Sequence, residues 1–167
     1  MRVNSDTLLA QLREQGVSYE YYEHIPLHTV EDAKKVQGNV ISQASDVLNI
    51  KNLYLRDRKK RNYLVVLEQD RVVDLAALGG HIGAGKLSFG SPERLMEHLG
   101  VRPGAVTPLA MVTGAAKGVH LYMDRMLETV EKVHVHPLVN DRTVTLRSAD
   151  LLTLLDLWGV TPMWLDF

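Results

Sequence analysis

The segment that most constrains the fold of this chain is the apolar run Val47–Leu55, which contains a single lysine, Lys51. Strand periodicity places Lys51 on one face with Val47, Leu53 and Leu55, and places the intervening residues on the other. Both faces are then largely apolar. A buried ammonium is costly unless it has a partner or faces a polar cavity. Two interpretations follow: a lysine at a sheet edge whose head group reaches water, and a lysine that faces a pocket.

The size and composition of the chain are those of an ordinary globular protein, and 167 residues are enough to bury a core. We expect one domain over residues 1–167. The absence of cysteine excludes disulfides, thiolate metal sites and a cysteine nucleophile. A formal net charge of −1 argues against non-specific coating of nucleic acid but allows a local basic patch. Apolar runs are short and no export signal is visible, so we expect no membrane contact and a cytoplasmic location.

Periodicity and capping residues predict strands and helices without a regular alternation of the two, which favours an α+β fold with a mixed sheet. Helices are expected over 5–16, 29–38, 74–78, 91–99 and 148–158, with a helical turn at 124–127. Strands are expected over 17–23, 47–55, 63–67, 86–89, 119–123, 130–135, 143–146 and 163–167.

The predicted turn between strands 47–55 and 63–67 is strongly basic. It reads Arg56-Asp57-Arg58-Lys59-Lys60-Arg61. Such a tip suits the phosphates of a nucleic acid, although a solvated charged turn explains the same pattern.

Three familiar catalytic or ligand-binding patterns can be examined, and none is complete. His134 and His136 share one strand face as a metal pair would, but no third ligand is apparent, so we expect no metal and a structural or substrate-contacting His136. The segment 80–88 imitates a phosphate-binding loop, but Leu87 stands where Ser or Thr must bind magnesium. No Gly-x-Ser-x-Gly elbow is present, which disfavours a serine hydrolase.

A rigid loop is predicted over 100–108, which contains two glycines and two prolines. Such a loop can turn backbone N–H groups towards a ligand carbonyl or phosphate, or can serve as a tight connection only.

Taken in order, several segments resemble the YbaK/ProX family of aminoacyl-tRNA editing domains, in particular its free-standing prolyl-tRNA editing proteins. The resemblance covers nearly the whole chain and rests on residues 51–55, 71–75, 86–89, 104–108 and 136–140 with the basic hairpin. It implies an α+β domain with a curved, largely antiparallel sheet, flanking helices and a cleft. It also implies an enzyme that needs no cofactor and hydrolyses the ester between a mischarged amino acid and the terminal adenosine of its tRNA.

The resemblance also implies roles for individual residues. Lys51 matches the family's essential lysine, and Gly104 and Pro108 match the ends of its Gly-x-x-x-Pro loop, so these three are the expected catalytic residues. The expected substrate-binding residues are Ile50, Asn52, Ala105, Val106, Thr107, His136 and Asn140. The residues expected to contact tRNA are Arg58, Lys59, Lys60 and Arg61, with Lys86 and Arg102 as further candidates.

The expected substrate is alanyl-tRNA(Pro), with prolyl-tRNA synthetase as a candidate partner. Pocket size must select the amino acid, and Ile50, Leu53 and Leu138 flank the motifs. The chain departs from the family at Asn49-Ile50, where His-Thr is common, and at Asp141-Arg142, where Thr-Ala is common. Two alternatives therefore stay open: editing of tRNA mischarged with Cys, Ser or Thr, and a non-catalytic module that binds aminoacyl-tRNA or a synthetase.

Overall fold

The computed structural model describes residues 3–38, 41 and 43–167. The helices of this part of the chain are α1 (Ser5–Glu14), α2 (Val30–Val36), α3 (Leu75–Ile82), α4 (Pro92–Leu99), the 3-10 helix η1 (Pro108–Ala110), α5 (Met111–Gly114), α6 (Met126–Thr129) and α7 (Ser148–Leu157). The strands are β1 (Tyr19–Glu23), β2 (Val47–Leu48), β3 (Ile50–Arg56), β4 (Asn62–Glu68), β5 (Ser88–Phe89), β6 (His120–Asp124), β7 (Lys132–Val135), β8 (Arg142–Arg147) and β9 (Met163–Leu165).

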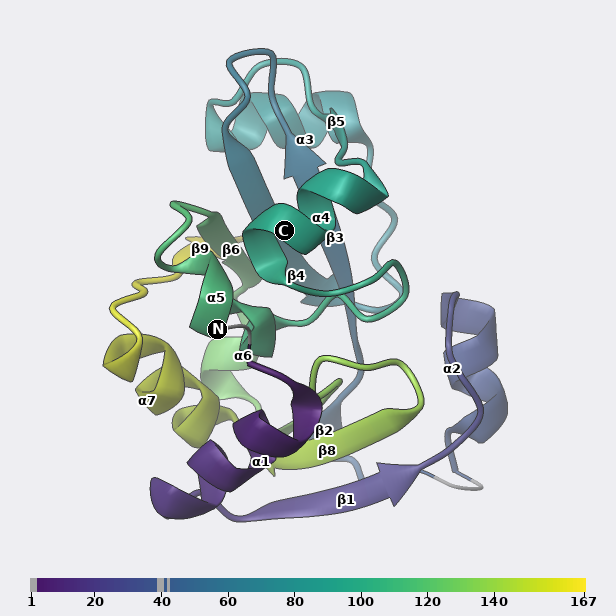
Figure 1. The fold of residues 1–167 in the computed structure, drawn as a ribbon. Coiled ribbons are helices and arrows are strands. Elements are labelled where there is room, and N and C mark those ends of the chain that lie inside the picture. The colour runs from purple at the N-terminus through teal and green to yellow at the C-terminus, as the bar shows by residue number, and fades with distance from the viewer. Residues whose placement is uncertain (1–2, 39–40, 42) are drawn as a thin grey trace.

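The strands form two sheets. One has the order β1-β8-β7-β2 and the other the order β5-β3-β4-β6-β9. Figure 1 shows the second sheet running up the molecule, with the first across its base and α2 at one side. Pairs β1·β8, β7·β8, β3·β4 and β3·β5 are antiparallel, whereas β2·β7, β4·β6 and β6·β9 are parallel. The predicted α+β class is confirmed, and its strands are divided between two mixed sheets.

The predicted strand 47–55 is interrupted at Asn49, where the chain passes from one sheet to the other. Before this point, β2 pairs in parallel with β7. After it, β3 pairs antiparallel with β4, and Lys51 lies opposite Leu67. Lys51 is therefore the second residue of β3, close to the point where the chain passes between the sheets. Periodicity alone could not reveal the crossing, because the apolar pattern continues through it.

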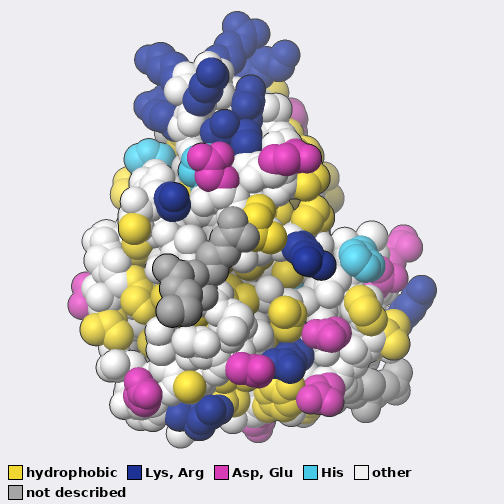
Figure 2. All heavy atoms as spheres, in the orientation of Figure 1, with side chains coloured by type: hydrophobic (Ala, Val, Ile, Leu, Met, Phe, Trp, Pro, Cys, Tyr) yellow, Lys and Arg dark blue, Asp and Glu magenta, His cyan; other side chains and the backbone are white. Residues whose placement is uncertain are grey.

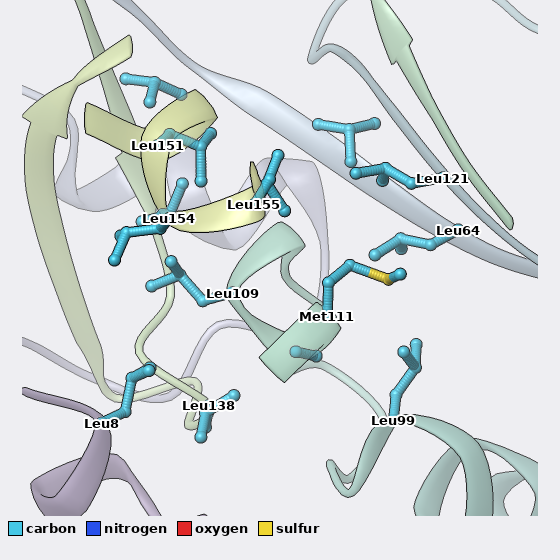
Figure 3. Packing of buried hydrophobic residues seen from close by; sticks show 14 of the residues in the cluster. Leu8, Leu64, Leu99, Leu109, Met111, Leu121, Leu138, Leu151, Leu154 and Leu155 are labelled. Atoms are coloured by element: carbon cyan, nitrogen blue, oxygen red, sulfur yellow. The ribbon is translucent and has the colours of Figure 1, made fainter. Parts of the chain in front are cut away.

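Two apolar cores cover the two faces of β3. The larger one contains Tyr54 and gathers leucines from α1, α4 and α7 against the sheets (Figure 3). The smaller one contains Leu55 and packs β4 against Leu78 of α3 and Leu165 of β9. Of the strand for which burial on both faces was predicted, Leu48, Tyr54 and Leu55 are buried, whereas residues 50–53 around Lys51 are partly buried.

The segment that imitates a phosphate-binding loop contains a helix end. Helix α3 ends at Gly83, which has the left-handed conformation (φ 72°). Gly79 lies so close to the carbonyl of Gly85 that an added Cβ would stand 1.9 Å from its oxygen. Close packing against Gly85 therefore requires a glycine at position 79. None of the described helices is long and apolar enough to cross a membrane.

Candidate active site

A cavity of about 270 Å³ opens where the beginning of β3 meets α2 and the loop before η1. Its lining comes from five stretches of the chain that are distant in sequence. The lining residues are Leu27, His28, Thr29, Val30, Ala33, Ile50, Lys51, Asn52, Leu53, Gln69, Gly104, Val106 and His136. The fold thus brings Lys51 together with parts of both later motifs named by the family resemblance.

The end of β3 beside the cavity has an open edge. Strand β5 pairs only with the far end of β3, and no described strand pairs on that side with residues 50–53. The carbonyl of Tyr54 accepts from the amide of Gly90 on the β5 side, at 3.0 Å. Alternation along an antiparallel strand then directs the backbone groups of Ile50 and Asn52 to the same side. Their N–H and C=O groups are available to a ligand.

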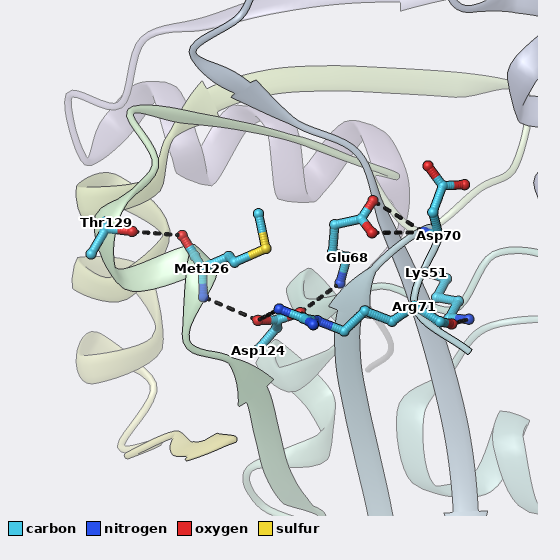
Figure 4. A network of polar contacts seen from close by, with 7 residues as sticks. All are labelled: Lys51, Glu68, Asp70, Arg71, Asp124, Met126 and Thr129. Carbon is cyan, nitrogen blue, oxygen red and sulfur yellow. Dashed lines mark hydrogen bonds and ion pairs between the residues drawn. The ribbon is translucent and has the colours of Figure 1, made fainter. Parts of the chain in front are cut away.

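Lys51 is partly buried and lines the cavity. Its ammonium donates a hydrogen bond to the backbone carbonyl of Arg71, in the segment that follows β4 (Figure 4). Of the two interpretations of this lysine, the geometry therefore favours the one that faces a pocket. Its catalytic role remains a prediction.

Asn52 presents an unsatisfied acceptor. It lines the cavity, and its Oδ1 is buried without a hydrogen-bond partner among the described residues. A buried acceptor that stays unpaired costs about 1–3 kcal/mol. A ligand that donates a hydrogen bond to Asn52 would remove this cost, which gives the predicted substrate-binding role a physical basis.

His136 presents a second acceptor. Its Nδ1 lies 3.0 Å from the carbonyl oxygen of Arg142. A carbonyl can only accept, so Nδ1 carries the hydrogen and Nε2 keeps its lone pair. Burial lowers the pKa of His136 below its usual value, the bond to Arg142 opposes this, and nearby His24 lowers the pKa further. The imidazole is therefore neutral near pH 7 and able to accept a proton or a hydrogen bond.

Gly104 and Val106 are the residues of the predicted loop 104–108 that line the cavity. Their backbone N–H groups bond to no protein group within the described chain. Gly104 has φ 88°, and an added Cβ would stand 3.0 Å from Nδ1 of His28 and 3.1 Å from Nδ2 of Asn140. Both the backbone conformation and the close approach require glycine here.

The other residues of this loop lie in the core and do not line the cavity. Ala105 is buried, and its amide donates to Arg102 at 3.0 Å. Thr107 is fully buried and caps η1, with its hydroxyl accepting from Leu109 at 3.3 Å. Pro108 is the buried first residue of η1. In this structure the side chains of Ala105, Thr107 and Pro108 are used in packing and capping, and their expected roles at the substrate stay predictions.

Asn140 also supports the site without lining it. Its side-chain Nδ2 donates to the backbone carbonyl of Leu27 at 3.2 Å. The backbone carbonyl of Asn140 accepts from the backbone amide of Leu27 at 2.9 Å. These bonds fix the segment that leads into α2. The expected direct contact of Asn140 with the substrate stays a prediction.

A smaller compartment of about 50 Å³ adjoins the cavity and shares several lining residues with it. Asn49 and Ile50, which depart from the family pattern, both line it, together with His134 and His136. Of the pocket-size candidates, Ile50 and Leu53 line the main cavity, whereas Leu138 is buried in the larger core. Within the described residues, no three His, Asp or Glu side chains converge as metal ligands.

The basic tip stands at the opposite end of β3. Arg58, Lys59 and Lys60 are exposed, and Figure 2 shows Lys and Arg side chains gathered at this end of the molecule. Strand β3 spans Ile50–Arg56, so at about 3.3 Å per residue the tip is roughly 20 Å from the cavity.

Arg61 differs from its neighbours because it closes the turn. Its Nε lies 2.6 Å from Oδ2 of the buried Asp57, and its amide lies 2.9 Å from Oδ1 of the same residue. Tyr63 donates to Asp57 as well, at 2.9 Å. A recess of about 230 Å³ beside this turn is lined by Arg56, Asp57, Arg58, Lys86 and Ser88. Lys86 therefore belongs to the basic end, whereas Arg102 is exposed on the loop before Gly104.

Comparison with known proteins decides what kind of site this is. Residues 24–154 match the family described as the aminoacyl-tRNA editing domain. The chain belongs to this family. The editing domain is 37% identical over 145 residues to the prolyl-tRNA editing protein ProX of Acetoanaerobium sticklandii, covering 86% of this chain and 85% of that protein. It is 34% identical to prolyl-tRNA synthetase associated domain-containing protein 1 of Danio rerio, over 93% of this chain and 83% of the relative.

Solved structures have the same fold as this editing domain. One, described as a candidate trans-editing enzyme for prolyl-tRNA synthetase, superposes with a TM-score of 0.66 at 18% identity and covers 100% of this chain and 99% of its own. Family membership makes the protein an aminoacyl-tRNA deacylase that edits mischarged tRNA, and tRNA its substrate. The alternative of a non-catalytic binding module is set aside.

Proposed function

We propose that this editing domain hydrolyses alanyl-tRNA(Pro) in trans, in the cytoplasm, and spares correctly charged prolyl-tRNA(Pro). The observation that carries the proposal is the position of Lys51, whose ammonium lines a cavity between an open strand edge and unpaired loop amides. The 37% identity to a prolyl-tRNA editing protein supports the choice of tRNA. Prolyl-tRNA synthetase is the corresponding candidate partner.

In this proposal, the cavity supplies charge and hydrogen-bond donors for ester hydrolysis. The ester carbonyl binds at the amides of Gly104 and Val106, which stabilise the oxyanion that forms when water attacks. The ammonium of Lys51 anchors the ester or the neighbouring phosphate by its charge. An aminoacyl ester is already activated, so positioning of water, assisted by the 2′-hydroxyl of the substrate, replaces a protein nucleophile.

The two unsatisfied acceptors suit the other end of the substrate. The α-ammonium of an aminoacyl ester is a strong donor, and Asn52 and His136, which carry these acceptors, both line the cavity. Charge-assisted hydrogen bonds of this kind fix orientation. The side chain of the amino acid then points into the compartment bordered by Ile50, whose small volume admits a methyl group better than the ring of proline.

Deacylation assays on a panel of tRNAs test the proposal. Wild type should rapidly deacylate alanyl-tRNA(Pro), but not prolyl-tRNA(Pro) or alanyl-tRNA(Ala). Lys51→Ala should abolish the activity with an unchanged fold, whereas Lys132→Ala, on the other sheet, should leave it intact. Persistence of alanyl-tRNA(Pro) together with loss of cysteinyl-, seryl- or threonyl-tRNA would assign the enzyme to another amino acid. Full activity in Lys51→Ala would refute the role of the lysine.

A further inference from the structure

The Lys51 ammonium donates a hydrogen bond to a backbone carbonyl, and the side chain of the same residue anchors that carbonyl to another strand. The carbonyl belongs to Arg71, whose side chain extends away from Lys51 towards the end of β6 (Figure 4). There the guanidinium makes a two-point contact with the carboxylate of Asp124, through Nε to Oδ2 and through Nη2 to Oδ1, the latter at 3.2 Å. The two bonds fix the direction of the arginine side chain as well as its charge.

Asp124 is well suited to serve as an anchor. Its side chain is 1% exposed. Besides Arg71, it accepts the amide of Glu68 at 3.0 Å and the amide of Met126 at 3.1 Å. Burial alone would raise the pKa of Asp124, but the hydrogen bonds from Arg71 and the two amides outweigh it and hold the pKa below its usual value. The carboxylate therefore stays charged at neutral pH and joins the ends of β4 and β6.

The segment around Arg71 is also held by short-range bonds, since the amide of Arg71 donates to the carbonyl of Glu68 at 3.2 Å and the amide of Asp70 to the carboxylate of Glu68 at 3.0 Å. The next residue, Val72, is 98% exposed and contributes no packing. The guanidinium of Arg71 packs over the ring of Phe167, with 4.4 Å from Cζ to the ring centroid. The side chain of Arg71 thus connects the backbone that binds Lys51 to β6 and to Phe167, which are distant in sequence.

We infer that Arg71 and Asp124 are positioning residues, which fix the carbonyl that aims the Lys51 ammonium into the cavity. This inference rests on the proposed catalytic role of Lys51. Neither residue touches the cavity, since neither belongs to its lining. When the clamp is broken, the carbonyl moves with its segment and the lysine loses its fixed direction. A displacement of about 1 Å in a catalytic group can lower a rate about 100-fold.

The test compares variants that break the clamp with one that breaks a neighbouring ion pair. Arg71→Gln and Asp124→Asn remove the charge pair, and Arg71→Lys retains it. The control, Glu128→Gln, breaks the exposed pair with Arg125 at the start of α6, which involves neither Arg71 nor Phe167. With alanyl-tRNA(Pro), we expect kcat to fall about 10- to 100-fold in the first two variants with little change in KM, partial recovery in Arg71→Lys, and no change in Glu128→Gln.

A second readout does not depend on activity. The rate at which Lys51 reacts with an amine-selective reagent, followed by peptide mass spectrometry, should rise in Arg71→Gln and Asp124→Asn because the ammonium is released from its carbonyl. Unchanged reactivity and unchanged kcat in folded Arg71→Gln would overturn the inference, even if the melting temperature fell. Failure of the proposed function looks different: wild type would then fail the deacylation panel, or Lys51→Ala would stay as active as wild type.

Discussion

The side-chain amides of Gln37 and Gln69 bond to each other reciprocally, with Nε2–Oε1 distances of 3.0 and 3.2 Å. This pair ties the end of α2 to the end of β4, so that the helix forms one wall of the cavity. The ion pair between Lys34 and Asp70, at 2.8 Å, joins the same elements but is exposed on both sides and contributes little. The partly buried amide pair is therefore the stronger tie.

A double-mutant cycle on Gln37 and Gln69 should reveal this tie. Each change to Met should raise KM for the aminoacyl-tRNA by loosening the wall, and the double variant should be hardly worse than either single one, because the first change already breaks the pair. The expected coupling energy is about 0.5–1.5 kcal/mol. Additive effects on KM would show that the two residues act separately.

Gly104→Ala should impair both stability and deacylation. Left-handed backbone in a residue with a side chain costs about 1–2 kcal/mol, and the added Cβ would also crowd His28 and Asn140 at the cavity. Gly118→Ala is the matched control, since Gly118 has φ 72° but nothing within 4 Å of an added Cβ. Equal losses of activity in the two variants would attribute the effect to backbone strain alone.

Local features of the fold could be read from the sequence, because they depend on neighbouring residues. The helix predicted over 91–99 is present as α4, with Ser91 as its N-cap and Pro92 as its first residue. The burial of Tyr54 and Leu55 in separate cores was likewise visible in the alternation of this strand. Sequence order could not reveal the crossing at Asn49 or the bond from Arg71 to Asp124, which joins residues 53 positions apart. Contacts of this kind depend on how the sheets pair.

The loop 104–108 illustrates the same limit within one motif. Its glycine and proline content predicted a rigid, backbone-exposing turn, which the positive φ of Gly104 bears out. Which side chains face inward was not predictable, because Ala105 and Thr107 can serve a pocket or a core equally well by type. Both side chains are buried in the core, and within this loop only Gly104 and Val106 line the cavity.

Stability should depend on pH through His136. The pKa of this imidazole is lowered in the folded protein, chiefly by burial, whereas the unfolded chain takes up the proton near the usual value of about 6.5. The unfolded state therefore binds more protons as the pH falls below that value, and the free energy of unfolding should decrease by up to about 1.4 kcal/mol per pH unit. Denaturant unfolding of wild type and His136→Gln between pH 7.5 and 5.5 measures this. If the free energy of unfolding of His136→Gln decreased as steeply with falling pH, His136 would not be the source of the pH dependence.

Ile50→Ala should relax the choice of amino acid. Ile50 borders both the main cavity and its smaller compartment, so its truncation enlarges the space for the substrate side chain. A few methylene groups in an apolar pocket discriminate by about 1–3 kcal/mol each, so hydrolysis of prolyl-tRNA(Pro) should rise relative to alanyl-tRNA(Pro). Leu138→Ala, which changes the core, should lower stability without this change in preference. An unchanged ratio in Ile50→Ala would place the size limit elsewhere.

Replacing Arg58, Lys59 and Lys60 by Ser should weaken tRNA binding without altering the chemistry. These exposed cations lie roughly 20 Å from the cavity along β3, a distance that the single-stranded 3′ end of tRNA can span before its acceptor stem begins. Each lost phosphate contact reduces the slope of log affinity against log salt by about 1, so the triple variant should lose about 2–3 units.

Hydrolysis of the minimal substrate alanyl-adenosine separates binding from catalysis in this variant. Its kcat/KM should equal that of wild type, because the tip is far from the ester. A control variant with Arg13, Lys132 and Arg147 changed to Ser removes as much charge from the base of the molecule and should keep the salt slope of wild type. If both triple variants lose affinity to the same extent, net charge and not the tip governs the encounter with tRNA.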